Sequence, residues 1–171
     1  MAIIVLRHAK ARASAGSGGD LDRALDPVGI QQAKTVAQVI GHLAIDTSRL
    51  RVLVSPALRC QNTVAPLVSR FSVEPLVDKR LLEYASDSEL LELVSLARSA
   101  SGTWVICGHG PSLLRLVRLL VREQGAMVAD RELSLGVAAF LYLEFWAVSG
   151  RPLSLLARYA PPRYQGTVLI G

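Results

Sequence analysis

The stretch IIVLRH, residues 3–8, determines the expected fold, because an apolar run without polar alternation ends abruptly on a cation and an imidazole. A run of this kind is typical of a strand that is buried on both faces of a parallel sheet. Three further runs of strand length share its character: Arg51–Val54, Val73–Val77 and Thr103–Cys107. We therefore expect four buried parallel strands, the first of which ends at Arg7 and His8.

Helical periodicity separates these runs. Apolar residues recur at helical spacing in four segments: 28–43, 58–68, 90–97 and 113–120. Strand and helix therefore alternate, which predicts an α/β domain. Near the C-terminus, Val137–Phe145 and Pro152–Tyr159 flank a turn at residues 148–151 and indicate an antiparallel hairpin. The expected fold class is α/β, with three α/β/α layers, a mostly parallel central sheet and an antiparallel edge hairpin near the C-terminus.

The composition limits the classes of protein to which the chain can belong. A length of 171 residues, of which 51% are hydrophobic, suits a single domain that spans residues 1–171. The longest apolar run, Gly136–Val148, contains Glu144 and fits a strand better than a membrane span, and the N-terminus lacks the features of a signal peptide. Two cysteines, Cys60 and Cys107, predict no disulfide framework and a cytoplasmic location.

The chain is basic, with a net charge of +5, and 16 of its 19 basic residues are arginine. These residues are scattered, without a Lys/Arg run, and few aromatic residues are present to stack on bases. We therefore expect no nucleic acid polymer as a partner; the alternative, which rests on charge alone, predicts salt-sensitive retention of DNA. Some of the arginines are instead candidates for holding an anionic substrate.

Two of the three histidines fall where an open parallel sheet builds its site. His8 directly follows the first expected strand, and His109 follows Thr103–Cys107 after one glycine. Ligands of such sheets bind beyond the carboxyl ends of the strands. His42 lies near the end of an expected helix and should be a surface residue.

Two expected helices begin at prolines shortly after strands, at Ser55-Pro56 and at Gly110-Pro111. Helix N-termini present free N–H groups and a positive dipole end to an anion. Ser55 is expected to cap the first of these helices, and Arg59 then lies about one turn into it, so its side chain can reach back toward the strand ends. We expect four side chains to surround one phosphate group: Arg7, His8, Arg59 and His109.

Other phosphate chemistries lack their sequence signatures. The chain contains no G-x-x-x-x-G-K-[ST] loop and no G-x-G-x-x-G after a strand. Neither cysteine is followed six positions later by an arginine, and Asp20 and Asp22 follow glycines rather than a strand. The spacing of Cys and His predicts no zinc cluster. Histidine therefore remains as the candidate nucleophile.

Five segments in chain order resemble motifs of the histidine phosphatase superfamily, in the form found in its small SixA-like branch. Leu6–Ala11 is similar to the R-H-G signature, with Ala9 in place of the glycine, and Ser55–Thr63 is similar to S-P-x-x-R-x-x-Q-T. The other three resemble the R-P-L-T-x-x-G turn, the segment with the family's acid and the second histidine motif: Asp22–Gly29, Leu82-Glu83 and Gly108–Gly110. The resemblance spans about residues 2–145.

This resemblance implies a phosphatase that needs neither a metal ion nor a cofactor. His8 would be the nucleophile that becomes phosphohistidine. Arg7, Arg59 and His109 would bind the phosphoryl oxygens, and His109 would also count among the catalytic residues.

The resemblance also implies a carboxylic acid in the site. Glu83 would donate the proton to the leaving group, with Asp20 or Asp22 as alternatives for that role. Lys10 and Arg23 are candidate substrate contacts.

The sequence leaves the substrate open. The loop from Lys10 to Leu25 is short, and Lys79–Ser101 is expected to be nearly all one helix, so the insertions that enclose sugar phosphates should be absent. An open site suits a phosphohistidine on a protein or a small phosphomonoester. One alternative is a nucleoside-diphosphate phosphatase, including oxidised guanine nucleotides, similar to the phosphatase domain of actinobacterial Nudix fusions. The other is a non-catalytic phosphate-binding module.

Overall fold

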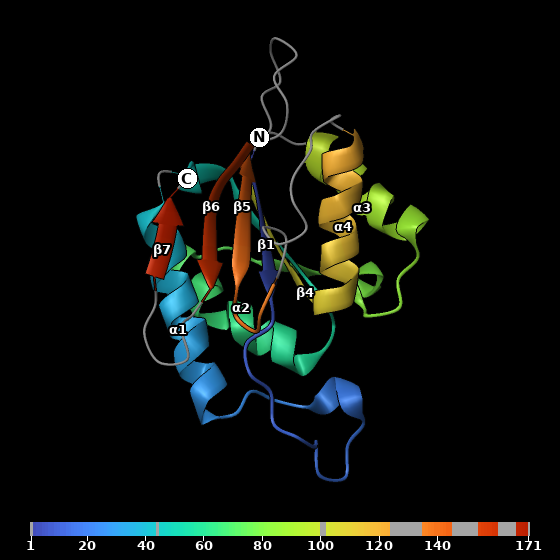
Figure 1. The fold of residues 1–171 in the computed structure, drawn as a ribbon. Helices are drawn as coiled ribbons and strands as arrows, with labels where there is room; N and C mark the ends of the chain where they lie inside the picture. The colour runs from blue at the N-terminus through green and yellow to red at the C-terminus, as the bar shows by residue number, and fades with distance from the viewer. Residues whose placement is uncertain are drawn as a thin grey trace.

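A computed structural model describes residues 2–43, 45–99, 102–123, 135–144, 154–160 and 167–170 (Figure 1). The described strands form one sheet in the order β3-β2-β4-β1-β5-β6-β7. β1 to β4 run parallel to one another, and β5 to β7 continue the sheet as antiparallel strands beyond β1. The strands span Ala2–Arg7 (β1), Leu50–Val54 (β2), Pro75–Val77 (β3), Thr103–Gly108 (β4), Phe140–Glu144 (β5), Ser154–Ala160 (β6) and Thr167–Ile170 (β7).

β1 is an interior strand of the sheet, because it pairs with β4 in parallel on one side and with β5 in antiparallel fashion on the other. Its apolar side chains are fully buried. Ile4 and Leu6 belong to the core cluster on one face of the sheet, and Ile3 and Val5 belong to the cluster on the other face. The prediction of a strand buried on both faces is therefore confirmed for this stretch.

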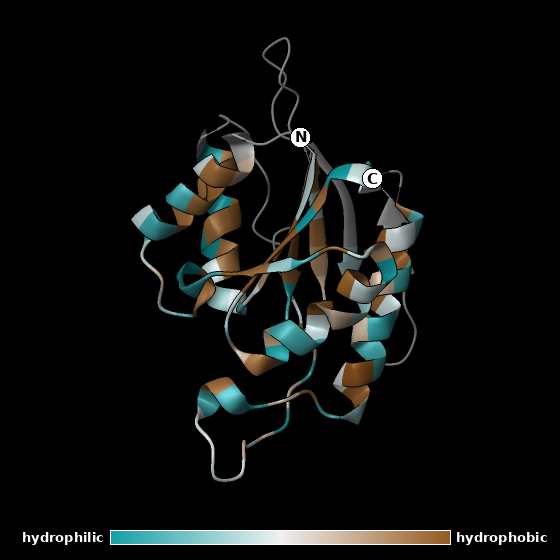
Figure 2. Ribbon diagram, turned by 180° about the vertical axis from the view of Figure 1, so that it is seen from behind, coloured by the Kyte–Doolittle hydropathy of each residue, from teal (hydrophilic) through white to brown (hydrophobic). Residues whose placement is uncertain are grey.

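Helices cover both faces of the sheet. α1 (Pro27–His42) and α2 (Leu58–Phe71) supply the cluster that contains Ile4 and Leu6. α3 (Asp87–Ser99) and α4 (Gly110–Glu123) supply the opposite cluster. Figure 2 shows the largely hydrophobic strands between these two helix layers. The predicted three-layer α/β/α architecture is confirmed; none of the described helices is long and apolar enough to cross a membrane.

The C-terminal strands form the predicted antiparallel edge. β5 pairs with β6, and the rings of Phe140 and Tyr159 stack across this pair with centroids 5.2 Å apart. β7 adds a further strand that the sequence pattern did not predict. The turn expected at residues 148–151 lies outside the described residues.

Two local predictions on the other side of the sheet were wrong. β3 is an exposed edge strand rather than a buried one, because among the described strands it pairs with β2 alone. The segment from Lys79 to Ser101 is not nearly one helix, because the short 3-10 helix η3 (Lys79–Leu81) ends before a turn. A capping box between Ser86 and Glu89 then starts α3.

A close approach between α1 and the segment after β1 fixes the chain next to His8. Asp26 caps α1, since its carboxylate accepts a hydrogen bond from the Gly29 N–H (2.7 Å). The Asp26 N–H in turn donates to the Lys10 carbonyl oxygen (3.0 Å). A Cβ at Gly29 would overlap that same carbonyl oxygen, so only glycine fits at this contact.

We expect Gly29→Ala to lower the free energy of unfolding by about 1–3 kcal/mol, because helix and loop must separate to admit the methyl group. Urea denaturation measures the change. Gly41→Ala in the same helix is the matched control, since its methyl group would meet the flexible side chain of Arg70 and alanine favours helix by about 1 kcal/mol. Equal losses in the two variants would contradict the close-contact explanation.

Candidate active site

The ends of β1 and β4 bring two histidines together. Arg7 pairs with Gly108 in the parallel register, so His8 and His109 each lie one residue beyond neighbouring strands. The two imidazole rings meet edge to face, with centroids 5.4 Å apart. The third histidine, His42, is exposed at the end of α1. The structure thus brings together two of the residues that the sequence marked as site residues and leaves His42 at the surface.

One hydrogen bond sets the tautomer of His8. Its Nδ1 lies 2.8 Å from the carbonyl oxygen of Ala9, and because a carbonyl only accepts, Nδ1 carries the ring proton and Nε2 keeps its lone pair. Burial lowers the pKa of His8 from its ordinary value of 6.5 to about 4. The bond to Ala9 opposes this shift, and the charges of neighbouring histidine and arginine side chains add to it. The imidazole is therefore neutral at neutral pH.

His109 is buried, and each of its two ring nitrogens contacts a neighbouring side chain. Nε2 lies 3.1 Å from the Ser55 hydroxyl oxygen, and Nδ1 lies 3.3 Å from Nη2 of Arg59. A guanidinium only donates, so Nδ1 accepts here and the proton on Nε2 faces Ser55. Ser55 was expected to cap α2, but α2 begins at Leu58 with Ala57 at its N-cap position. That prediction was wrong because the Ser55 side chain lies against His109.

Arg59 and Arg7 are cations whose guanidinium groups are only partly satisfied. Arg59 is 2% exposed; it donates to the Asp20 carbonyl oxygen (2.7 Å) and to the Asp20 carboxylate (2.9 Å), while its Nε has no partner among the described residues. Arg7 donates from Nη1 to the Leu135 carbonyl oxygen (2.9 Å), and within the same part of the chain its buried Nε has no partner either. Buried N–H groups are rarely left unpaired, so the two together mark a place where an anion would bind.

All seven predicted site residues line one cleft, here called the histidine cleft, of about 320 Å³: Arg7, His8, Lys10, Arg23, Arg59, Glu83 and His109. Lys10 forms an ion pair with Asp26 (3.1 Å), and Arg23 forms one with Asp20 (2.7 Å). Glu83 reaches the cleft from the segment between η3 and α3. Two guanidinium groups, a neutral imidazole and a carboxyl group can together bind a tetrahedral dianion, attack it and exchange a proton with it.

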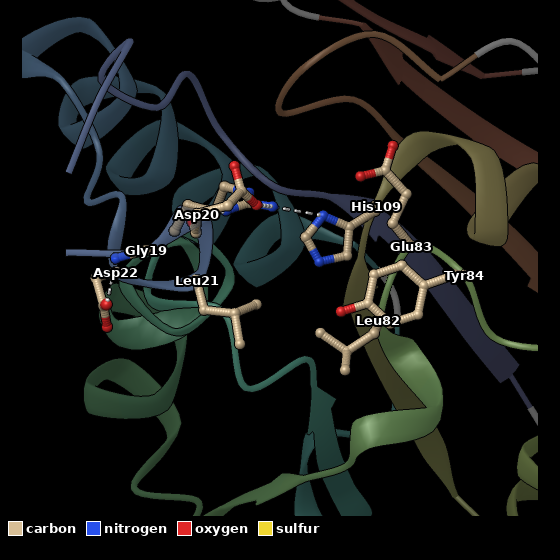
Figure 3. Close-up of a pocket in the computed structure, with 9 residues that line it drawn as sticks. Gly19, Asp20, Leu21, Asp22, Leu82, Glu83, Tyr84 and His109 are labelled. Atoms are coloured by element: carbon tan, nitrogen blue, oxygen red, sulfur yellow. Dashed lines mark hydrogen bonds and ion pairs between the residues drawn. The ribbon is translucent and has the colours of Figure 1, made fainter.

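A second cleft, here called the side cleft, adjoins the first. It has about 510 Å³ and is lined by Gly19–Asp22, Arg59, Leu82–Tyr84 and His109. Figure 3 shows Leu21 on one side of this space, Leu82 and Tyr84 on the other, and His109 between them. Arg59, Glu83 and His109 line both clefts, so the two clefts adjoin at these residues.

The alternative acids Asp20 and Asp22 also lie in the side cleft. Burial raises the pKa of Asp20, but hydrogen bonds from Arg23 and Arg59, together with the charges of both arginines, outweigh this and hold the pKa below its usual value. Asp20 is therefore ionised and paired at neutral pH. The Asp22 carboxylate accepts a hydrogen bond from the Gly19 N–H (3.0 Å) within the 3-10 turn η1 (Asp20–Asp22).

Two residues that support the site were not predicted as site residues from the sequence. The Thr63 hydroxyl accepts from the Ala9 N–H (2.9 Å) and donates to the Arg59 carbonyl oxygen (2.6 Å), so it ties the segment after β1 to α2. The Cys60 thiol lies 3.8 Å from Nε2 of His109. The threonine of the S-P-x-x-R-x-x-Q-T motif was a signal for the first contact; nothing in the sequence pointed to the second.

A mostly parallel α/β sheet with these groups at its carboxyl edge is an arrangement suited to binding and attacking a phosphoryl group. The chain belongs to the histidine phosphatase superfamily (branch 1), whose family model matches residues 3–92. It is accordingly a hydrolase that acts on phosphorylated substrates. No curated protein gives a match.

Solved structures share the fold over most of the chain. A putative phosphohistidine phosphatase SixA from Agrobacterium tumefaciens has a TM-score of 0.74 at 20% identity, covering 94% of this chain and 98% of that one. A putative SixA from Nakamurella multipartitia has a TM-score of 0.65 at 27% identity, with 83% of each chain covered. A mycobacterial glucosyl-3-phosphoglycerate phosphatase has a TM-score of 0.65 at 17% identity, covering 90% of this chain and 96% of that one.

The lowered pKa of His8 links stability to pH. Because the folded-state pKa of about 4 lies below the ordinary value of 6.5, the unfolded chain binds the proton more tightly, so stability is lost as the pH falls through that window. Between pH 7 and pH 5 we expect His8 to account for a loss of about 1–2 kcal/mol. In urea denaturation at both pH values, His8→Gln should lose less stability than the wild type by this amount. His42→Gln, at the exposed histidine, should lose as much stability between pH 7 and pH 5 as the wild type. If His8→Gln also lost that same amount, the lowered pKa would be refuted.

Proposed function

We propose that this phosphatase transfers the phosphoryl group of its substrate to Nε2 of His8 and then to water, without a metal ion. The observation that carries the proposal is the state of His8: a neutral imidazole, whose proton is held on Nδ1 by the bond to Ala9, in a cleft with the buried Arg59 and the half-buried Arg7. Phosphoryl transfer needs mainly positioning and positive charge around the three equatorial oxygens. Arg7 and Arg59 supply that charge here.

Substrate binding would rearrange the contacts of Arg59 and His109. A phosphoryl oxygen takes the place of the Asp20 carboxylate at Nη2 of Arg59, where the present distance is 2.9 Å. His109 then shifts its proton to Nδ1 and donates to the same phosphoryl group, while the Ser55 hydroxyl turns to donate to Nε2. Arg7 donates its unpaired Nε–H to a second oxygen.

The reaction then has two steps with balanced proton transfers. Nε2 of His8 forms a bond to phosphorus as the bond to the leaving oxygen or nitrogen breaks, and Glu83 gives its proton to the leaving atom. The Glu83 carboxylate next takes a proton from water, whose oxygen attacks phosphorus as the P–N bond to His8 breaks. We assign this role to Glu83 rather than to Asp20, because Asp20 is ionised and paired with arginine.

For the substrate we propose a phosphohistidine protein or a small phosphomonoester. The open side cleft supports this choice, and the similar folds include proteins described as SixA phosphohistidine phosphatases. A nucleoside-diphosphate phosphatase remains the second candidate, and a non-catalytic phosphate-binding module the third. A sugar-phosphate substrate, as named for the mycobacterial relative, belongs in the same assay panel. We place the protein in the cytoplasm, which fits its free buried cysteines, Cys60 and Cys107.

We expect His8→Ala to abolish turnover of p-nitrophenyl phosphate, with kcat lower by at least about 10³-fold, because no other group can take up the phosphoryl group. Rapid acid-quench of the wild type with labelled substrate should trap an adduct that is stable in base and labile in acid. His42→Ala is the matched control and should keep wild-type kcat and KM. Turnover by His8→Ala at a wild-type rate would refute the proposal, whereas tight phosphate binding without turnover in the wild type would favour the non-catalytic module.

For Glu83→Gln we expect a loss of kcat/KM of about 10²–10⁴-fold with an alkyl phosphate and a much smaller loss with p-nitrophenyl phosphate. A poor leaving group needs the proton in the transition state, and p-nitrophenolate does not. Asp20→Asn should show no such dependence on the leaving group. Equal losses for both substrates in Glu83→Gln would remove Glu83 from the acid role, and a leaving-group dependence in Asp20→Asn would transfer the role there.

A further inference from the structure

We infer that the side cleft binds the leaving group of the substrate and that it selects planar leaving groups without negative charge. This inference rests on the proposed function, since it takes the histidine cleft as the phosphoryl site. It concerns a separate set of residues: Leu21, Asp20, Asp22, Leu82 and Tyr84.

The residues that the two clefts share place the leaving group in the side cleft. Arg59, Glu83 and His109 line both clefts. When Arg59 and His109 hold the phosphoryl group and Glu83 protonates the leaving atom, the rest of the leaving group extends past these three residues. The side cleft is the depression that begins there, and its volume of about 510 Å³ is enough for a ring system.

The walls of the side cleft favour a flat, apolar group. The Leu21 residue is 41% exposed and the Tyr84 residue is 80% exposed, although both are large hydrophobic residues. They lie on opposite sides of the same space, with Leu82 beside Tyr84 (Figure 3). A ring placed between Leu21 and Tyr84 would remove from water apolar surface of its own and of both side chains. It would also stack on the tyrosine ring or meet the edge of that ring.

The charges of the side cleft oppose an anionic leaving group. Asp20, Asp22 and Glu83 contribute three carboxyl groups, and Arg59 is the one cation among the described residues that line the cleft. Arg59 is engaged by the phosphoryl group in the proposed complex, so a second phosphate or a carboxylate in this cleft would face acidic side chains without a free cation. Lys10 and Arg23 line the histidine cleft instead. A neutral aromatic ring or an imidazole, which becomes cationic when protonated, meets no such repulsion and can stack on Tyr84.

The substrate class that follows is a phosphate bonded to an uncharged or cationic ring, such as an aryl phosphate or a phosphorylated imidazole. Bisphosphates and nucleoside diphosphates whose second phosphate would enter the side cleft are disfavoured. Tyr84 and Leu21 are the residues that determine this specificity by contact, and Asp20 and Asp22 determine it by charge.

Binding of phosphonates, which cannot be hydrolysed, tests the inference by calorimetry. The wild type should bind phenylphosphonate about tenfold more tightly than methylphosphonate, the effect of removing roughly 55 Å² of apolar surface from water. It should bind 4-carboxyphenylphosphonate more weakly than phenylphosphonate. Tyr84→Ala and Leu21→Ala should each lose most of the preference for the phenyl group and keep the affinity for methylphosphonate, while Tyr84→Phe should retain the preference.

Leu96→Ala is the matched control, because Leu96 is 42% exposed on α3 and does not line the cleft. It should keep all three affinities. Asp22→Asn should reduce the discrimination against 4-carboxyphenylphosphonate. Equal wild-type affinities for phenyl- and methylphosphonate, or tightest binding of the carboxylated compound, would overturn the inference. Because binding is measured, the result stands apart from turnover: loss of activity in His8→Ala tests the proposed function, and the phosphonate ratios test the side cleft.

Discussion

The packing of two arginine side chains, one buried and one half-buried, beside two imidazoles is the constraint on which the rest of the site depends. Arg59 is almost wholly buried, and its counter-charge comes from the exposed carboxylate of Asp20. Arg7 donates a hydrogen bond to a main-chain carbonyl oxygen rather than to a carboxylate. Burial, to which the positive charge of the neighbouring side chains adds, keeps His8 unprotonated, with a pKa of about 4. A group that would otherwise be half-charged near pH 6.5 thus keeps its lone pair, which is the property that a nucleophile needs.

Short contacts between neighbouring elements hold these side chains in place. Thr63 joins the segment after β1 to the first turns of α2, so the backbones that carry His8 and Arg59 are coupled through one hydroxyl. Gly110, the first residue of α4, lies against Arg7, where a Cβ would come within 3.1 Å of the guanidinium group. Ser55, which lies just before α2 in the chain, holds Nε2 of His109 through its hydroxyl group. α2 and α4 therefore contribute through residues at or near their N-terminal ends, where they meet the carboxyl edge of the sheet.

The strands that position the site could be predicted from the sequence because a buried strand has a distinctive local pattern of apolar residues. Ile3–Leu6 and Thr103–Cys107 are unbroken apolar runs, and the residue types that follow them are polar, so both the strands and the positions of His8 and His109 could be predicted. What could not be predicted depends on contacts between distant segments. The exposure of β3 follows from its place at the sheet edge, and the ion pair of Arg59 with Asp20 joins residues 39 positions apart. Ser55 looked like a helix cap because its partner, His109, is 54 positions away.

The two clefts carry opposite charge, and Asp20 connects them. Its side chain is 61% exposed in the 3-10 turn η1 and also pairs with Arg23, so it can leave Arg59 with little loss, as is usual for exposed ion-pair partners. In the proposed reaction the phosphoryl group displaces Asp20 from Arg59, and the released carboxylate then belongs to the wall of the side cleft. Binding of the phosphoryl group therefore makes that cleft more negative at the moment when the leaving group enters it. After hydrolysis the same carboxylate competes with inorganic phosphate for Arg59, so a single side chain opposes anionic leaving groups and assists release of the anionic product.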